Sequence, residues 1–338
     1  MEFALWSRRI RLNRHDLVGA KVVENLSGRT VLVTGASSGI GLAVAKQLAG
    51  SGARTLLGCR DKDRAREAME RIRIAHPAAR VEFVHLDLAS LESVEEAAAE
   101  LADRAGELDV LVNNAGVMAP TPGHTPDGYE VQIGVNHLGH FALTGHLLPL
   151  LLTAEQPRVV TVTSSMHKLA VRNELTDFKI LPHGSNWLGY GRSKVANLMF
   201  AFELDRRAHG RLHSLAAHPG VARSDLVART EGGGRRVVGP VLRHGTHIVA
   251  QSADQGARPI LFAATAKAAL KAGAARPKVR GEDPDLTGTR YFGPRGPGGL
   301  RGAPTVAGAS ALARNQELAR ELWEASVEAT GVRYAALG

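Results

Sequence analysis

The chain of 338 residues has little cysteine, few aromatic residues and no apolar run of bilayer length. Cys59 has no partner for an intrachain disulfide, which fits a reducing compartment. Aromatic residues make up 4% of the chain and hydrophobic residues 44%, so the core must be mostly aliphatic. The longest apolar stretch, 141–154, is too short for a bilayer and contains His146 and Pro149. These scarcities exclude a disulfide-stabilised scaffold and predict a chain without a membrane-spanning helix.

Blocks of basic residues interleaved with aromatic residues are also missing, although the formal net charge is +9. The arginines and lysines are scattered, for example over 8–14, 235–238 and 276–280. We therefore expect no nucleic-acid partner, and binding of a phosphorylated cofactor explains part of the charge. The first residues place a short apolar piece before their charges, which is the opposite order to a secretory signal. A cytoplasmic protein without membrane contact is expected.

Apolar runs of strand length alternate with segments of helical character along most of the chain. The expected strands are 29–35, 54–59, 81–88, 108–116, 159–165 and 212–220. The expected helices are 42–52, 63–76, 90–106 with Ser90 as N-cap, and 315–331 docking through Leu318, Leu322 and Trp323. This alternation predicts an α/β fold, a Rossmann-type doubly wound parallel sheet with helices on both faces.

No second core is visible, so a single domain with a C-terminal extension is expected. We expect a basic lead-in over 1–27, a dinucleotide-binding catalytic domain over 28–310, and a C-terminal helix and tail over 311–338. The glycine-rich segment 221–248 is a candidate substrate loop, and 273–310 is rich in glycine, proline and arginine without periodic runs.

The first expected strand leads directly into TGASSGIG, residues 34–41. Gly35, Gly39 and Gly41 allow a tight turn and a close approach of the backbone to a ligand. The helix that follows presents unpaired N–H groups and a partial positive charge to a pyrophosphate. Between a first strand and a first helix, this spacing indicates nucleotide binding. The residues expected to contact the cofactor here are Gly35, Ser37, Ser38, Gly39, Ile40 and Gly41.

The end of the second strand bears on the choice between NAD and NADP. NAD-binding folds usually carry an acid there for the ribose hydroxyls, whereas an arginine accommodates the extra phosphate of NADP. Cys59 stands at the acid's usual position and Arg60 follows it, which favours NADP. Asp61 leaves NAD binding open.

Tyr190 and Lys194 are four residues apart in YGRSK, so on a helix they share one face. A protonated lysine near a phenol favours the phenolate and lowers its pKa from about 10. The pair therefore predicts a tyrosine that gives or takes a proton near neutral pH.

Together these features resemble the short-chain dehydrogenase/reductase family. TGASSGIG is similar to its cofactor loop, NNAG at 113–116 to its fourth strand, and YGRSK to its Tyr-x-x-x-Lys motif. VNHLGHFALT, 135–144, and the ending from RYFGPRG onward resemble the branch of retinol dehydrogenases and protochlorophyllide reductases. The resemblance covers about 28–331 and rests on four motifs in order.

The resemblance implies a role for each matching residue. Tyr190 would be the general acid or base, and Lys194 would lower its pKa and bind the nicotinamide ribose. Ser165 would bind the substrate oxygen, in preference to Ser164. Asn136 would hold a water that connects Lys194 to solvent, and a bond from its side chain to backbone is compatible with that role. The further cofactor contacts implied are Asp87, Leu88, Asn114, Ala115, Gly116, Pro219, Gly220 and Ser224.

The expected function is an NADP(H)-dependent oxidoreductase, a ketoreductase or alcohol dehydrogenase acting on a hydrophobic carbonyl or alcohol. An epimerase or dehydratase with bound nucleotide, and a non-catalytic dinucleotide sensor, remain open. His137, His140, His167 and His218 lack accompanying acids or cysteines, so no metal is expected. By resemblance, the helices holding Asn136 and Tyr190 could form a homodimer or homotetramer.

Overall fold

The computed structural model of the chain describes residues 22–170, 175–180, 186–221, 251–272 and 290–337. The basic lead-in lies almost wholly outside these ranges, as does the candidate substrate loop beyond Val221. Ser224, expected near the cofactor, is among the residues outside the described ranges.

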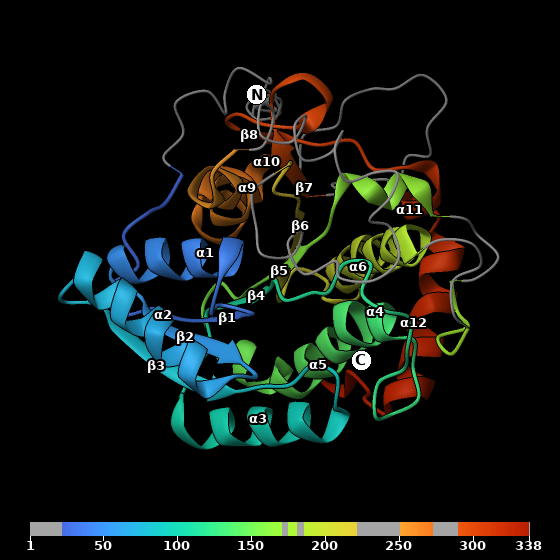
Figure 1. The fold of residues 1–338 in the computed structure, drawn as a ribbon, viewed down its shortest axis with the longest axis horizontal. Helices are drawn as coiled ribbons and strands as arrows, with labels where there is room; N and C mark the ends of the chain where they lie inside the picture. The colour runs from blue at the N-terminus through green and yellow to red at the C-terminus, as the bar shows by residue number, and fades with distance from the viewer. Residues whose placement is uncertain (1–21, 171–174, 181–185, 222–250, 273–289, 338) are drawn as a thin grey trace, which may run out of the picture.

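The centre of the fold is an eight-stranded sheet in the order β3-β2-β1-β4-β5-β6-β7-β8 (Figure 1). Its strands are β1 (Thr30–Thr34), β2 (Arg54–Cys59), β3 (Arg80–His85), β4 (Val110–Asn113), β5 (Arg158–Val162), β6 (His213–Ala217), β7 (Tyr291–Pro294) and β8 (Pro304–Val306). All neighbouring pairs are parallel except β7 and β8, where Gly293 lies opposite Thr305. The strand order reverses between β1 and β4, so the doubly wound sheet is confirmed.

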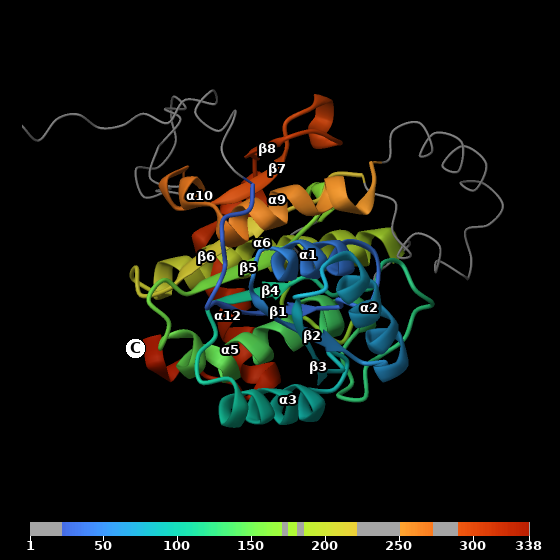
Figure 2. The same ribbon diagram turned by 90° about the vertical axis from the view of Figure 1, so that its left-hand side faces the viewer.

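Helices cover both faces of this sheet because successive strand residues point to opposite sides. Val31 and Val33 pack with α1 (Gly39–Gly50), α2 (Lys62–Ala75) and α9 (Ala253–Thr265). Leu32 packs with the opposite layer, where α3 (Leu91–Arg104) and α5 (Gly139–Leu151) lie. Figure 2 shows α9 and α3 on opposite sides of the strands.

The remaining helical elements connect or flank these layers. They are α4 (Val131–Ile133), η1 (Gly134–Leu138), η2 (Ser165–Leu169), α6 (Asn186–Arg207), α10 (Lys267–Ala272), η4 (Pro297–Gly299), α11 (Ala311–Arg314), α12 (Gln316–Thr330) and η5 (Ala335–Leu337). Among the described helices, none combines the length and the apolar composition that crossing a membrane requires.

Two local predictions are confirmed. The Ser90 hydroxyl accepts a hydrogen bond from the Ser93 N–H at 3.2 Å and begins α3. Leu318, Leu322 and Trp323 are buried on α12, where the Trp323 ring stacks on Phe200 of α6 with centroids 5.9 Å apart. Because α12 packs against both α5 and α6, the chain's own helix occupies part of the surface through which self-association was expected.

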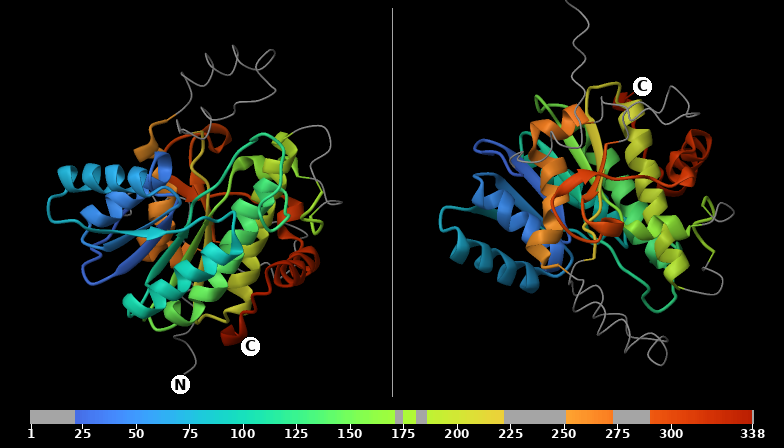
Figure 3. Two further views of the ribbon diagram at one scale, coloured as in Figure 1. Left: turned by 60° about the horizontal axis from the view of Figure 1, so that its bottom comes forward. Right: turned by 90° about the horizontal axis from the view of Figure 1, so that it is seen from above.

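The C-terminal edge of the sheet was not predicted. The segment 273–310 shows no long periodic run and no strand was predicted there, but β7 and β8 lie within it, beside α9 (Figure 3). β7 has four residues and includes Gly293 and Pro294, and β8 has three residues. Strands this short carry no periodic signal, so pairing with β6 decides their conformation.

Candidate active site

The glycine loop lies at the carboxyl end of β1, where α1 begins. Gly35 has a φ of 66°, in the left-handed region, and a Cβ added there would come 2.9 Å from the Ala115 Cα. A Cβ on Gly41 would strike the Gly35 carbonyl oxygen and lie 2.5 Å from Asn114 Nδ2. Ser38 is the N-cap of α1, but its side chain makes no capping bond. The first N–H groups of α1 therefore have no capping side chain, which fits a site for a pyrophosphate.

Thr34 joins this loop to the end of β4. The Asn114 and Ala115 N–H groups each donate to Thr34 Oγ1 at 2.9 Å, and Asn114 Nδ2 donates to the Thr34 carbonyl at 2.8 Å. A Cβ on the next residue, Gly116, would lie 3.0 Å from Asn136 Oδ1 and 3.5 Å from Lys194 Nζ. The cofactor residues predicted on β1 and β4 thus adjoin the predicted catalytic residues.

The end of β2 carries the residues that distinguish NAD from NADP. Cys59 is buried, and burial raises the pKa of its thiol. The Asp61 carboxylate accepts the N–H groups of Asp63 and Arg64 at 3.0 Å each, so it serves as the N-cap of α2. The Arg60 side chain is 72% exposed, and its nearest acid is Asp87 at 3.8 Å. Arg60 is therefore available to an anion, whereas the Asp61 carboxylate is engaged by backbone.

Asp87 and Leu88 follow β3, close to Arg60. The Asp87 carboxylate accepts the Ala89 N–H at 3.0 Å, and Leu88 is buried against the α3 layer. Both residues lie at the same edge of the sheet as the glycine loop, as parallel strands require.

Tyr190 and Lys194 are buried one turn apart on α6, as predicted. Lys194 Nζ lies 5.5 Å from the centre of the Tyr190 ring and donates to the Val162 carbonyl at 3.3 Å. Their pKa values differ from the prediction. Burial raises the pKa of Tyr190 to about 12, and burial lowers the pKa of Lys194 to about 8. Removal from water has the larger effect, so the expected lowering of the tyrosine pKa is wrong.

Ser164 and the predicted Ser165 both lie between β5 and the body of η2, and the role predicted for Ser165 stays a prediction. A side-chain hydrogen bond with Ser164 lowers the pKa of Tyr190, against the larger effect of burial. Ser164 also caps η2 by accepting the Met166 N–H at 3.3 Å, whereas Ser165 begins η2 and lines a neighbouring cavity.

His167 fixes the Ser164 main chain, a role the sequence did not reveal. Its Nε2 accepts the Ser310 N–H at 3.2 Å, so the proton is on Nδ1, which donates to the Ser164 carbonyl at 2.7 Å. Burial lowers the pKa of His167, which favours this neutral form. A residue beyond β8 therefore helps to orient the serine beside Tyr190.

Asn136 lies in a π-helical turn, η1, and its side chain is committed to protein partners. Asn136 Oδ1 accepts the Val117 N–H at 2.8 Å, while Nδ2 donates to the Val117 carbonyl and to Ser193 Oγ at 2.9 Å each. The backbone bonding that was expected to be compatible with a relay is therefore present. The water-holding role of Asn136 stays a prediction.

His140 connects Asn136 to the glycine loop and is a second residue whose role sequence reasoning missed. Its Nδ1 contacts the Asn136 carbonyl at 3.0 Å, and its Nε2 contacts Thr34 Oγ1 at 2.8 Å. Burial lowers the pKa of His140 to about 4, so the ring is neutral. The only indication of this role in the sequence is that His140 follows Asn136 by about one helical turn.

Pro219 and Gly220 follow β6 at the same edge. The Pro219 carbonyl accepts Gln251 Nε2 at 2.5 Å, and Gly220, with a φ of 72°, packs against the Leu300 carbonyl. Within the described ranges, no three His, Cys, Asp or Glu side chains are grouped as a metal site would require.

Comparison with known proteins agrees with this geometry. A family model described as short chain dehydrogenase matches residues 29–232. Retinol dehydrogenase 14 of Mus musculus is 42% identical over 212 residues, which cover 60% of this chain and 63% of that protein, less than two thirds of its length. Retinol dehydrogenase 13 of Homo sapiens is 35% identical over 309 residues, which cover 91% of this chain and 86% of that protein.

Solved structures show the same fold. A crystal structure of an uncharacterized protein from Mycobacterium Paratuberculosis has a TM-score of 0.69 at 35% identity and covers 92% of this chain and 97% of that chain. A Beutenbergia cavernae structure, named as an NAD(P) dependent gluconate 5-dehydrogenase with bound NADP, has a TM-score of 0.57 at 28% identity and covers 71% of this chain and 91% of that chain. Fold, site and family model agree, and the chain belongs to the short-chain dehydrogenase family.

Proposed function

We propose that this protein is an NADP(H)-dependent oxidoreductase that interconverts a carbonyl and an alcohol, with Tyr190 as the acid and base. The observation that carries the proposal is the buried pair of Tyr190 and Lys194, with Ser164 nearby and Gly116 next to Lys194. A phenol and a hydroxyl that hydrogen-bond each other can bind the same substrate oxygen.

A nicotinamide dinucleotide, when bound, supplies or accepts the hydride at the substrate carbon. The protein's own side chains supply and accept the proton. In reduction, Tyr190 Oη donates its proton to the carbonyl oxygen as negative charge builds there, and Ser164 Oγ–H stabilises that charge. In oxidation, Tyr190 takes the hydroxyl proton back. The ammonium of Lys194 is placed to favour the phenolate that remains after reduction.

Burial raises the pKa of Tyr190 to about 12, so the phenol carries its proton and can act as an acid in reduction. Oxidation uses the ionised phenol, whose formation the nearby ammonium of Lys194 would favour.

The preference for NADP rests on Arg60, whose exposed guanidinium can meet the additional phosphate. An acid that could accept the ribose hydroxyls is absent from position 59, and Asp61 is engaged in capping α2. The relatives named retinol dehydrogenases and the aliphatic cavity wall formed by Pro294, Val306 and Ala307 support a hydrophobic carbonyl substrate, such as a retinoid-like aldehyde.

The test is a panel of aliphatic aldehydes, ketones and retinal with NADPH and with NADH, repeated with Tyr190→Phe. We expect NADPH to give the higher kcat/KM, and Tyr190→Phe to lower kcat by about 10²–10⁴-fold while NADPH still binds. Fluorescence titration of NADPH separates lost chemistry from lost cofactor binding. Parent-like turnover by the folded variant would contradict the role of Tyr190, and a clear advantage for NADH would contradict the role of Arg60.

A further inference from the structure

A cavity of about 330 Å³ opens beside the proposed reaction centre. Ser165 forms part of its wall and directly follows Ser164, which contacts Tyr190. His218, which precedes the predicted cofactor contacts Pro219 and Gly220, forms another part. The cavity therefore adjoins the place where a substrate carbonyl would react. Its size is near the lower end of the range for ligand sites.

The inner part of this cavity is aromatic and neutral. The Tyr291 ring lies between two histidine rings, with centroids 5.8 Å from His167 and 5.4 Å from His218. Burial lowers the pKa of His218 to about 4 and also lowers that of His167, so neither ring carries a charge at neutral pH. Pro294 and Val306 add apolar atoms beside these rings, in a lining that is polar over most of its surface.

The outer part of the cavity is cationic without a balancing acid. Lys168 and Arg295 line it and are exposed, and no carboxylate is among the lining residues. Within the described ranges, neither side chain forms an ion pair, whereas Arg54 and Arg206 pair with Glu82 and Glu203. Lys168 also contributes to the lowered pKa values of His167 and His218, so its charge acts on the inner part of the cavity.

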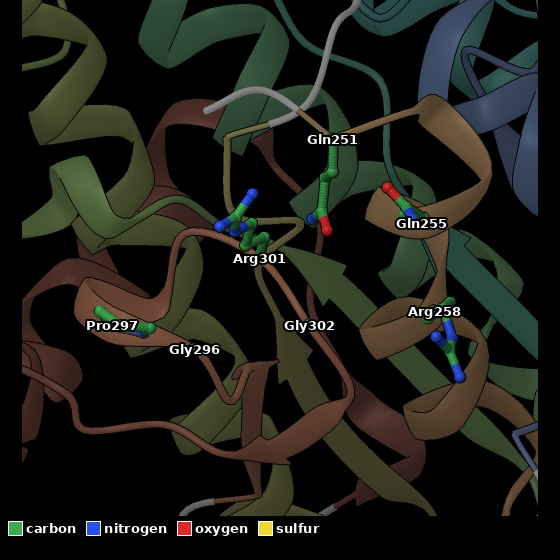
Figure 4. Close-up of a pocket in the computed structure, with 7 residues that line it drawn as sticks. All are labelled: Gln251, Gln255, Arg258, Gly296, Pro297, Arg301 and Gly302. Atoms are coloured by element: carbon green, nitrogen blue, oxygen red, sulfur yellow. The ribbon is translucent and has the colours of Figure 1, made fainter. Parts of the chain in front are cut away.

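A second cavity of about 430 Å³ lies across the loop that contains Gly296 (Figure 4). Arg258 and Arg301 line it with Gln251, and its lining also lacks a carboxylate. In Figure 4 the guanidinium of Arg258 points away from Arg301, so these two arginines do not converge on one point. Ser165 and the two histidines do not line this second cavity. Arg258 lines it and does not line the first cavity, so it can serve as a control cation for Lys168 and Arg295.

We propose that the first cavity holds the far end of the substrate, and that this end carries an anionic group, a carboxylate or a phosphate, bound by Lys168 and Arg295. The inference rests on the proposed function and specifies its substrate class: an apolar carbonyl compound with a charged terminus. The rings and apolar atoms of the lining would hold the chain and the two cations would fix its end, which sets the distance between the carbonyl and the charge.

Calorimetric binding of octanoate, octyl phosphate and octanol to the protein loaded with NADP⁺ tests the inference without turnover. We expect at least one of the two anions to bind about tenfold more tightly than octanol, and this preference to weaken as salt is added. The double substitution Lys168→Gln/Arg295→Gln should abolish the preference and leave octanol binding unchanged. Arg258→Gln removes one positive charge outside the cavity and should retain the preference.

Equal binding of octanol and both anions by the parent protein would overturn the inference. It would also be overturned if the double variant kept the preference, or if Arg258→Gln lost as much of it, since the charge of the whole surface would then be responsible. The panel of aldehydes and ketones with NADPH, repeated with Tyr190→Phe, is the separate test of the proposed function. If no compound of the panel is reduced while octanoate binding depends on Lys168 and Arg295, the proposed function fails and the anion site stands.

Discussion

The two halves of the sheet are built differently. On the cofactor side, β1, β2 and β4 end in glycines, an asparagine and backbone N–H groups, and the close contacts at Gly35 and Gly41 involve main chain. On the substrate side, the ends of β5 and β6 adjoin buried polar side chains, including Tyr190, Lys194 and His167. The cofactor half therefore depends on backbone conformation, and the substrate half on side chains brought together from distant parts of the chain.

The two halves also differ in how their positively charged side chains are paired. Arg54 on the cofactor half is partly buried and pairs with Glu82 at 2.7 Å. On the substrate half, Arg192 pairs with Glu130 at 3.4 Å in the interior, while Lys168 and Arg295 line a cavity without acids. Arg192 is thus buried and paired, whereas the two cations around the cavity are open to a ligand.

The largest expected effect is loss of the buried ion pair on the substrate half. Arg192 lies within YGRSK, contacts Glu130 beside α4, and donates to the carbonyls of Asp177 and Ile180 at 3.3 Å each. Arg192→Met should lower the free energy of unfolding by about 3–5 kcal/mol, because a buried carboxylate loses its counter-charge. Urea unfolding measures this value.

The control for this prediction is the double variant Arg192→Met/Glu130→Gln, which should recover part of the stability because the uncompensated charge is removed. A loss below about 1 kcal/mol in the single variant, the range of exposed pairs, would show that the two halves do not differ in this respect.

A smaller effect is expected for the serine beside Tyr190. Ser164→Ala should lower kcat for carbonyl reduction by about 10²–10³-fold, since a donor to the developing oxyanion is removed. NADPH affinity, measured by fluorescence, should change little, because Ser164 lies on the substrate half. Ser165→Ala should reduce kcat less. If Ser165→Ala lowered kcat more than Ser164→Ala, Ser165 would be the serine that binds the substrate oxygen, as the sequence predicts.

On the cofactor half, Gly41→Ala should disturb the main-chain turn between β1 and α1. The new Cβ would strike the Gly35 carbonyl oxygen, and overpacking of this kind costs about 1–3 kcal/mol. We expect NADPH affinity to fall by about tenfold, measured by fluorescence titration, with a smaller change in kcat at saturating NADPH. Gly123→Ala is the control, since a Cβ there meets no atom within 4 Å. Unchanged affinity in Gly41→Ala would contradict the backbone-dependent character of this half.

The smallest effect expected is a shift in the pH profile. Burial lowers the pKa of Lys194 to about 8, so the ammonium is present below that pH and lost as pH rises through it. Reduction should therefore slow above about pH 8, as the phenolate left on Tyr190 loses its adjacent cation. Lys194→Arg should move this falling limb to higher pH, because a guanidinium stays charged. Lys62→Arg, on exposed α2, should leave the profile unchanged. An identical falling limb in Lys194→Arg would assign it to another group.

The cofactor half was largely predictable from the sequence because its determinants are local. The residues of TGASSGIG turn from β1 into α1, and Ser90 caps α3, as their chemistry requires. The substrate half was predicted less well. β7 and β8 were missed, because strand pairing decides their conformation.

The amino-acid sequence alone determined the first six strands, the glycine turn and the one-turn spacing of Tyr190 and Lys194, since each depends on neighbours along the chain. Tertiary structure decided that Ser164 lies beside the phenol, how far burial moves the pKa values of Tyr190 and Lys194, and which cations border the substrate cavity. The physical reason is that desolvation and contact across the sheet depend on residues far apart in sequence, such as Ser310 and His167, which meet only in the folded chain.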